Sequence, residues 1–393
     1  TINSDGVQVY FSKGNLQYMA VGGANGNANG TASSGENVGG TWRFAENQWD
    51  YVGNAAGNTA PSATQSNWID LFGWGTSGYH YSNDPYNTNY YPYSTSTSTV
   101  NTSYNYYGYG PSTNQSNPNI AGSNYDWGVY HSSTTTGNGG VIANGNGASW
   151  RTLQGYGDNT AEWNYLFNTR TCTYKYAHAQ LTVNGTSSQS VSTVNGVSAC
   201  GATVNGMIVF PDDFAWPEGY GFNAFSTYNS ATAYTTNKLT ESQWSLLEKA
   251  GAVFLPAAGY RDLTYLHSND LWGHYWASTV NGTGTSSTAI AMSFDATRRL
   301  NNASGISGSG ANLREYGFSV RPVYDSNGSV DDQDIFIRTD SIAYVANRET
   351  NTLYGTMLGL LIGQEDLTQG FVIGTTRDVD LSTTVLRSEE HTS

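Results

Sequence analysis

Apolar residues in this chain occur in short runs that are separated by Gly, Asn, Ser and Thr. The longest runs, such as 251–258 and 357–362, fall far below the ~20 apolar residues that a transmembrane helix needs. Several runs alternate apolar and polar side chains with the period of two that is typical of strands, and 7–11 is one of them. The pattern predicts a β-rich chain with no transmembrane segment in these residues.

The charge balance excludes some partners. The chain carries 30 acidic and 16 basic residues, a formal net charge of -14, and charged residues make up only 12% of it. A nucleic-acid-binding surface needs a basic face to meet phosphates, so we expect no nucleic-acid partner. A surface solvated by Asn, Ser, Thr, Gly and Tyr is typical of secreted or cell-surface proteins. The sequence begins at Thr1 rather than Met, which we interpret as a mature product or a fragment that lacks its signal sequence.

Two helices are predicted among the strands. The first begins near Thr160, a candidate N-cap for the apolar face of 163–167. In the second, Thr240 and Gln243 have the spacing of a capping box, and Gly251 provides a C-terminal stop.

Polar insertions and turns interrupt the ordered segments. The tetrapeptide Thr-Val-Asn-Gly begins at Thr182, Thr193, Thr203 and Thr279, and because Asn-Gly favours tight turns, the first three copies predict successive turns. Insertions are expected at about 19–40 and 79–124. Ten tyrosines lie from Tyr79 to Tyr109 with a single acid between them. Such a segment fits either a lineage-specific insertion or a recognition loop, because Tyr offers a large contact area at a low entropic cost.

Sequence signatures of catalysis are missing. The chain contains no Gly-x-Ser-x-Gly, no His-Glu-x-x-His, no P-loop and no dinucleotide-binding glycine fingerprint after a strand. Asp212-Asp213 is the most suggestive carboxylate pair, and a role in a turn or helix cap is the better interpretation. Cys172 and Cys200 are the only cysteines and could form one bridge.

Six blocks of sequence resemble a known family. They are 9–18 (Val-Tyr-Phe-Ser-Lys-Gly-Asn-Leu-Gln-Tyr), 42–50 (Trp-Arg-Phe-Ala-Glu-Asn-Gln-Trp-Asp), 150–153 (Trp-Arg-Thr-Leu), 254–261 (Phe-Leu-Pro-Ala-Ala-Gly-Tyr-Arg), 275–278 (Tyr-Trp-Ala-Ser) and 317–323 (Gly-Phe-Ser-Val-Arg-Pro-Val). In this order they resemble the C-type-lectin-like surface proteins of gut Bacteroidetes. That group is related to the formylglycine-generating-enzyme, or sulfatase-modifying-factor, type of domain and to the variable proteins of diversity-generating retroelements.

The resemblance implies an α+β fold, namely a C-type-lectin-like domain over residues 1–325 with long polar insertions. The enzymatic branch of the group is a thiol-dependent, copper-using oxidase with paired Cys near its C-terminal motif. No Cys follows Cys200 here, so we expect a binding protein and not an enzyme, with no cofactor. Arg321 is expected to be a structural residue that pairs with a buried acid.

By the resemblance, ligand-facing side chains lie on loops between the last strands, roughly 262–312. The polar candidates there are Tyr265, His267, Asp270, His274, Asn281, Asp295, Arg298, Arg299 and Arg314. Arg298-Arg299 could hold an anionic ligand through fork-shaped hydrogen bonds, or could be solvated or tied to Asp295. The two histidines and Asp270 have no recognised metal spacing, so no metal site is predicted. The Glu-Pro-Asn and Gln-Pro-Asp triplets of calcium-dependent lectins do not occur.

A second module follows a linker at 326–334. Residues 326–393 carry 11 acids and four basic residues. Strand-like runs in 335–386 resemble the first half of a fibronectin-type-III module, so a truncated, all-β Ig/fibronectin-like sandwich is expected. The last seven residues, 387–393 (Arg-Ser-Glu-Glu-His-Thr-Ser), match the translation of a common sequencing adapter, so we expect the natural sequence to end near Leu386 in a metagenomic fragment.

Together these features predict a secreted or outer-membrane-anchored surface protein that binds a protein or glycan ligand through variable loops. Two alternatives stay open. One is a structural adhesin or stalk component, and the other is a retroelement-diversified receptor.

Overall fold

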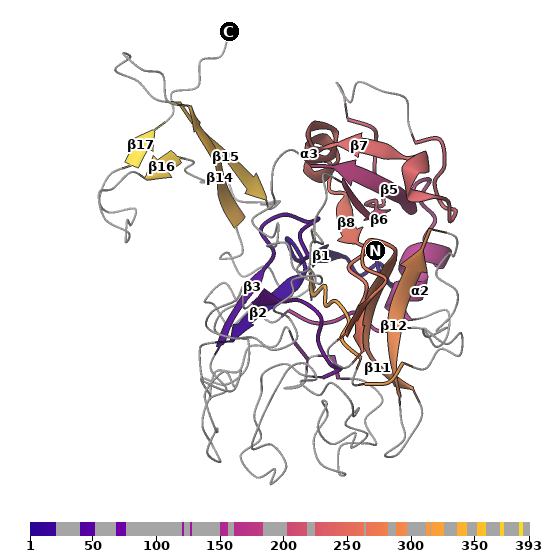
Figure 1. Ribbon diagram of the computed structural model, residues 1–393. Coiled ribbons are helices and arrows are strands. Elements are labelled where there is room, and N and C mark those ends of the chain that lie inside the picture. Colours follow the sequence, from indigo (N-terminus) through magenta and orange to yellow (C-terminus); the bar gives the residue numbers. More distant parts are fainter. Residues whose placement is uncertain are drawn as a thin grey trace. The chain divides into compact units, whose positions relative to one another are not determined.

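The computed structural model divides into two compact units, Thr1–Asn327 and Gly328–Ser393, which we call the larger and the smaller unit (Figure 1). The structure describes residues 1–20, 40–51, 68–75, 120–121, 126–127, 150–155, 161–183, 203–217, 225–262, 265–281, 288–296, 312–314, 316–325, 336–343, 352–358, 370–372 and 385–387.

The described part of the chain is mostly β-strand, with two short α-helices. The strands of the larger unit are β1 (Val9–Phe11), β2 (Leu16–Ala20), β3 (Gly40–Phe44), β4 (Trp68–Ile69), β5 (Tyr176–Thr182), β6 (Thr203–Val209), β7 (Lys238–Thr240), β8 (Val253–Pro256), β9 (Tyr260–Asp262), β10 (Tyr265–His267), β11 (Trp272–Asn281), β12 (Thr288–Asp295) and β13 (Val323–Asp325). The helices are α2 (Glu162–Asn164), which continues as the π-helix η3 (Tyr165–Thr169), the 3-10 helix η4 (Tyr234–Thr236) and α3 (Glu241–Lys249). The β-rich prediction is confirmed.

The last segment of the larger unit, residues 317–323, joins several parts of the chain. Strand β1 pairs antiparallel with β13, which brings the two ends of the unit together. Just before β13, Phe318 exchanges backbone hydrogen bonds with Phe72, and the N–H of Leu16 donates to the carbonyl of Val320. Segments that are far apart in sequence therefore depend on one stretch of backbone.

Buried Arg321 holds this junction together. Its guanidinium donates to the side-chain oxygens of Asn15 and Gln48, at 3.3 and 2.9 Å, and to the carbonyl of Lys13 at 3.2 Å. The expected buried acid is not its partner, so that prediction was wrong. Gln48 in turn donates a hydrogen bond to the Glu248 carboxylate at 3.0 Å, so an acid lies beyond the amide and does not contact the guanidinium. Burial lowers the pKa of Arg321 to about 10, which leaves it charged at neutral pH.

The larger unit also contains a four-stranded sheet with the strand order β7-β5-β6-β8. The Thr-Val-Asn-Gly copy that begins at Thr203 lies inside β6, so the prediction of a turn at Asn205-Gly206 was wrong. Gly206 packs where a Cβ would lie 2.6 Å from both the Leu255 carbonyl and the Phe254 ring. Asn205 bonds across to Asp270. Long-range packing therefore overrides the local turn preference. The second copy lies outside the described residues.

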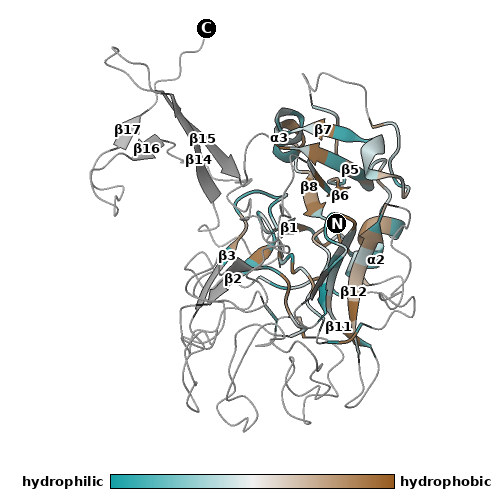
Figure 2. Cartoon of the chain, viewed as in Figure 1, coloured by the Kyte–Doolittle hydropathy of each residue, from teal (hydrophilic) through white to brown (hydrophobic). Residues whose placement is uncertain are grey.

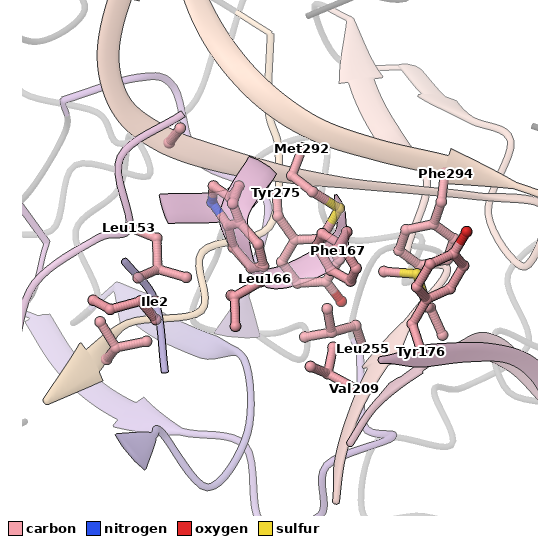
Figure 3. Packing of buried hydrophobic residues seen from close by; sticks show 14 of the residues in the cluster. Ile2, Leu153, Leu166, Phe167, Tyr176, Val209, Leu255, Tyr275, Met292 and Phe294 are labelled. Carbon is pink, nitrogen blue, oxygen red and sulfur yellow. The ribbon is translucent and has the colours of Figure 1, made fainter. Parts of the chain in front are cut away.

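Side chains on both faces of this sheet are buried. On one face, α3 places Trp244 against Phe254, with ring centroids 5.4 Å apart. On the other, Tyr176, Val209 and Leu255 pack with residues of the β11–β12 hairpin (Figure 3). Figure 2 shows the hydrophobic residues along β8 between these layers. Each large apolar side chain buried here contributes roughly 1.5–3 kcal/mol.

The capping box and the C-terminal stop that the sequence predicts for α3 are both confirmed. Thr240 accepts a hydrogen bond from the Gln243 N–H, the Gln243 side chain returns to the Thr240 N–H, and Gly251 has the positive φ of 86° that ends a helix. The first helix begins later than predicted. Its N-cap is Ala161, whose methyl side chain cannot cap the helix. In the first turn, the Glu162 carboxylate accepts hydrogen bonds from both terminal nitrogens of Arg151 at 2.7 Å. The Thr160 N-cap prediction was therefore wrong.

Substituting Thr240→Ala should lower the free energy of unfolding by about 1 kcal/mol, because the first turn of α3 loses its side-chain acceptor. Urea unfolding followed by circular dichroism measures this. Thr235→Ala, at an exposed position of η4, is the matched control and should change little. Equal effects of the two substitutions would show that the cap does not stabilise the helix.

Asp212 and Asp213 lie in a turn after Pro211, as predicted. Asp212 also pairs with buried Arg170 at 3.0 Å, whose guanidinium donates to backbone carbonyls including that of Phe210. Asp212 therefore has a structural role in this turn. Cys172 carries a free thiol, and Cys200 lies outside the described residues.

The smaller unit contains β14 (Phe336–Ala343), β15 (Thr352–Leu358), β16 (Gly370–Val372) and β17 (Val385–Arg387). Strands β14 and β15 pair antiparallel with an irregularity near Thr339, and β16 pairs with β17. The described residues of this unit are all in strands. The last of them is Arg387, the first residue of the segment attributed above to an adapter.

Candidate functional site

Four aromatic side chains gather near the surface of the larger unit, and we call Tyr260, His267, Trp272 and Tyr316 the aromatic surface. The rings of His267 and Tyr260 stack with centroids 4.9 Å apart and planes at 22°. Trp272 stacks on Tyr260 more loosely, at 6.4 Å and 24°, and Tyr316 meets Tyr260 edge-on at 5.9 Å. His267 is exposed and the other three are partly exposed, so the group has a solvent-facing side.

Pairing of three strands creates this group. In the β9–β10 pair, His267 lies directly opposite Tyr260. Gly259 bridges to Gly273, which brings the start of β11 and Trp272 alongside β9. Gly259 has a φ of 72°, and a Cβ there would lie 2.7 Å from the Asn269 nitrogen, besides colliding with the His267 carbonyl. Only glycine permits β9 to approach the β10–β11 turn this closely.

Beneath the aromatic surface lies a packed floor. The buried rings of His274 and Phe318 stack at 4.8 Å and 19°, and Phe318 packs on Trp276 at 4.3 Å. The His274 Nδ1 shares a 2.7 Å hydrogen bond with the Ser293 hydroxyl. Burial lowers the pKa of His274 to about 3, which keeps the imidazole neutral at physiological pH. The floor is therefore uncharged.

Two carboxylates border the aromatic surface. Asp262 follows Tyr260 by two positions in β9 and thus shares its face of the strand. Burial raises the pKa of Tyr260, and the Asp262 charge raises it further. Asp295 lies opposite Trp272 in the β11–β12 register. Both carboxylates are partly exposed.

No Lys or Arg side chain that the structure describes between 259 and 325 is exposed to offset these acids. The three described arginines there, Arg261, Arg314 and Arg321, are 4%, 2% and 1% exposed. Arg314 lies over the Trp74 ring, 4.8 Å from its centroid. The described surface around the aromatic group is therefore acidic.

Asp270 has a structural task at the turn between β10 and β11. Its Oδ1 accepts the Asn205 N–H at 2.7 Å, and the Asn205 side-chain amide donates to the Asp270 carbonyl at 2.9 Å. Asp270 has a φ of 59°, a region that Asp and Asn tolerate better than most residues. Burial raises its pKa to about 6. The residue fastens the turn to β6.

Asp270→Asn should raise the free energy of unfolding at pH 7.5 by about 1–2 kcal/mol, because it removes a half-buried charge and keeps a side chain suited to the turn. The folded-state pKa of about 6 exceeds the unfolded value of ~3.9. The stability that protonation of Asp270 contributes is therefore present below pH 4 and lost as pH rises through 6.

The difference between variant and wild type should accordingly vanish near pH 4. Denaturant unfolding at pH 4, 5, 6 and 7.5 measures it, with Asp213→Asn as the control for loss of an exposed carboxylate. A difference that stays constant over this range would contradict the raised pKa.

The structure brings only some of the predicted site residues together. His267 belongs to the aromatic surface and Asp295 borders it. His274 was expected on an exposed loop, but it is a buried residue of β11. Asn281 ends β11 and donates to the Thr288 hydroxyl across the β11–β12 hairpin at 3.2 Å. Tyr265 lies in β10, with no description of its side chain, and Arg298 and Arg299 lie outside the described residues.

Sequence reasoning missed Tyr260, Trp272 and Tyr316 as site residues. It selected polar side chains and gave these aromatic residues no role in a site. A usable signal was alternation, since Tyr260 and Asp262 flank buried Arg261 and so face the other side of β9.

Among the described residues, no three His, Cys, Asp or Glu side chains gather in a way that could hold a metal ion, and no helix has the length and hydropathy to cross a membrane. Comparison of the chain with protein-family models, with curated proteins and with solved structures finds no match. The function proposed below therefore depends on the residues and their geometry alone.

Proposed function

We propose that this chain is a non-enzymatic binding protein, secreted or held at a cell surface, and that it holds its ligand on the aromatic surface. One observation carries the proposal. Tyr260 has ring contacts with His267, Trp272 and Tyr316 and yet remains partly exposed. Rings fixed in this way offer a large contact area with little entropy left to lose on binding.

Rigid, clustered aromatic residues are the usual centres of binding energy in interfaces. The stacked arrangement leaves Tyr260 few rotamers, and the His274–Phe318 floor prevents the rings from collapsing inward. The surface is therefore preorganised. A purely structural role would favour rings buried as fully as Trp74 or Trp276, which are 0% exposed.

We further propose that the larger unit has a C-type-lectin-like fold. The blocks that carry this resemblance meet in space. Residues 317–323 bond to the block at 9–18 through Leu16, to the block at 150–153 through Arg151, and to the block at 275–278 through Trp276. Residue Gln48 of the block at 42–50 bonds to Arg321. A scaffold assembled around one final segment leaves the neighbouring strands β9, β10 and β11 to present the ligand site.

A glycan array and a peptide array, each probed with the labelled full chain, test the proposal. We expect at least one class of array element to retain the wild-type chain, and Tyr260→Ala with His267→Ala to reduce that signal at least tenfold. Tyr10→Ala removes a ring that is 61% exposed and lies outside the aromatic surface, so it is the matched control.

Retention that is unchanged in the double variant would place the ligand elsewhere. A chain that retains no element but assembles into filaments or surface layers would instead support the structural adhesin alternative. Near-ultraviolet circular dichroism of each variant shows whether its fold is intact.

A further inference from the structure

We propose that the aromatic surface recognises a cationic group, specifically a Lys or Arg side chain presented by a protein partner, with Asp262 and Asp295 meeting its charge. This inference rests on the proposed function, because it names the chemical class of ligand for the same site. The ligand that we propose is a basic peptide segment, and not a neutral glycan or an acidic partner.

The ring faces and the acids provide the first argument. An aromatic ring attracts a cation over its face, and the attraction grows when the cation loses water. Tyr260 has Asp262 on the same face of β9, and Trp272 has Asp295 opposite it in the neighbouring strand. Aromatic rings bordered by carboxylates are chemically complementary to guanidinium or ammonium groups.

Asp262 supplies the second argument. Its Oδ1 is buried and has no hydrogen-bond partner in the described part of the structure. A buried carboxylate oxygen without a donor is costly. The Asp262 side chain as a whole is partly exposed, so a rotation of its carboxylate would let an incoming N–H group bond to this oxygen. Asp270 differs in this respect, because its carboxylate already accepts the Asn205 donors.

Charge provides the third argument. The chain has a net charge of -14, and the described arginines around the site are all buried. An acidic partner would be repelled at long range, whereas a basic segment would be drawn toward the surface. Arginine is the better candidate of the two cations, because its planar guanidinium can stack on a ring and bond a carboxylate at the same time.

Three blocked hexapeptides test the proposal on the full chain by isothermal titration calorimetry. Each alternates glycine with one other residue, which is arginine, glutamine or glutamate. We expect the arginine peptide to bind at least tenfold more tightly than the glutamine peptide at 0.15 M salt, and the glutamate peptide not to bind.

Matched variants separate the site from general attraction to an acidic protein. Asp262→Asn and Asp213→Asn remove the same charge, but Asp213 is exposed and lies outside the aromatic surface. We expect Asp262→Asn to weaken the arginine peptide about tenfold and Asp213→Asn to change its affinity less than twofold. His267→Ala, at an exposed position, should weaken it severalfold without a risk to folding.

Equal affinity of the arginine and glutamine peptides, or equal effects of the two Asp→Asn variants, would overturn the cationic-ligand proposal. In that event, array signals that still disappear in the Tyr260→Ala and His267→Ala double variant would leave the proposed binding function intact. If the array signals also stay unchanged in the double variant, both the cationic-ligand proposal and the proposed binding surface are overturned.

Discussion

Gly259→Ala is expected to destabilise the larger unit by about 3 kcal/mol or more and to abolish binding at the aromatic surface. Two costs add. The positive φ of 72° strains any residue with a Cβ by ~1–2 kcal/mol. The added methyl group also meets backbone, including the Asn269 nitrogen and Cα at 2.7 and 2.9 Å, and backbone cannot move aside as a side chain can. Overpacking of this kind costs ~1–3 kcal/mol.

The control for Gly259→Ala is Gly6→Ala. Gly6 also has a positive φ, of 80°, but a Cβ there would meet nothing within 4 Å. Its substitution therefore isolates the strain term and should cost only ~1–2 kcal/mol. Thermal unfolding followed by near-ultraviolet circular dichroism measures both variants. Similar losses for Gly259→Ala and Gly6→Ala would show that β9 and the β10–β11 turn are not in close contact.

Arg321→Leu is expected to lower the free energy of unfolding by roughly 3–5 kcal/mol, because it leaves buried acceptors without their donor. Those acceptors are the Asn15 and Gln48 side-chain oxygens and the Lys13 carbonyl. They belong to two separate segments near the start of the chain, so the final segment would lose its side-chain bonds to both while its backbone bonds to the first, such as Leu16 to Val320, remain. Denaturant unfolding measures the loss.

Arg321→Lys is the informative comparison, because it retains the charge but not the planar fork. It should recover only part of the stability. Full stability in Arg321→Lys would show that charge alone matters, and an Arg321→Leu chain as stable as wild type would refute the role of Arg321 in joining these segments.

Local sequence signals predicted those features that depend on neighbouring residues. The capping box at Thr240 and Gln243 and the stop at Gly251 formed as expected, because each is satisfied within one helix. The first strand was also recognisable from alternation, since β1 lies within the alternating run 7–11. Such features depend on backbone propensity and short-range hydrogen bonds, which the sequence displays directly.

Features that depend on distant contacts were not predictable in the same way. Asn205-Gly206 has the sequence of a turn, yet Asp270 and the Phe254 ring fix it within β6. Glu162 accepts Arg151 and so helps to set the start of the first helix. The aromatic surface also depends on distant contacts, because it forms only where β9 pairs with β10 and where Gly259, just before β9, bridges to Gly273 of β11.

The central claim is that Tyr260, His267, Trp272 and Tyr316 form the binding surface, and ring chemical shifts test it most directly. The full chain, labelled with ¹³C in its aromatic side chains, would be titrated with the tightest-binding array element and followed by nuclear magnetic resonance. We predict that the largest shifts fall on His267, Tyr260 and Trp272, and that Tyr10 stays unchanged. Saturable binding that leaves these rings unshifted while others move would contradict the claim.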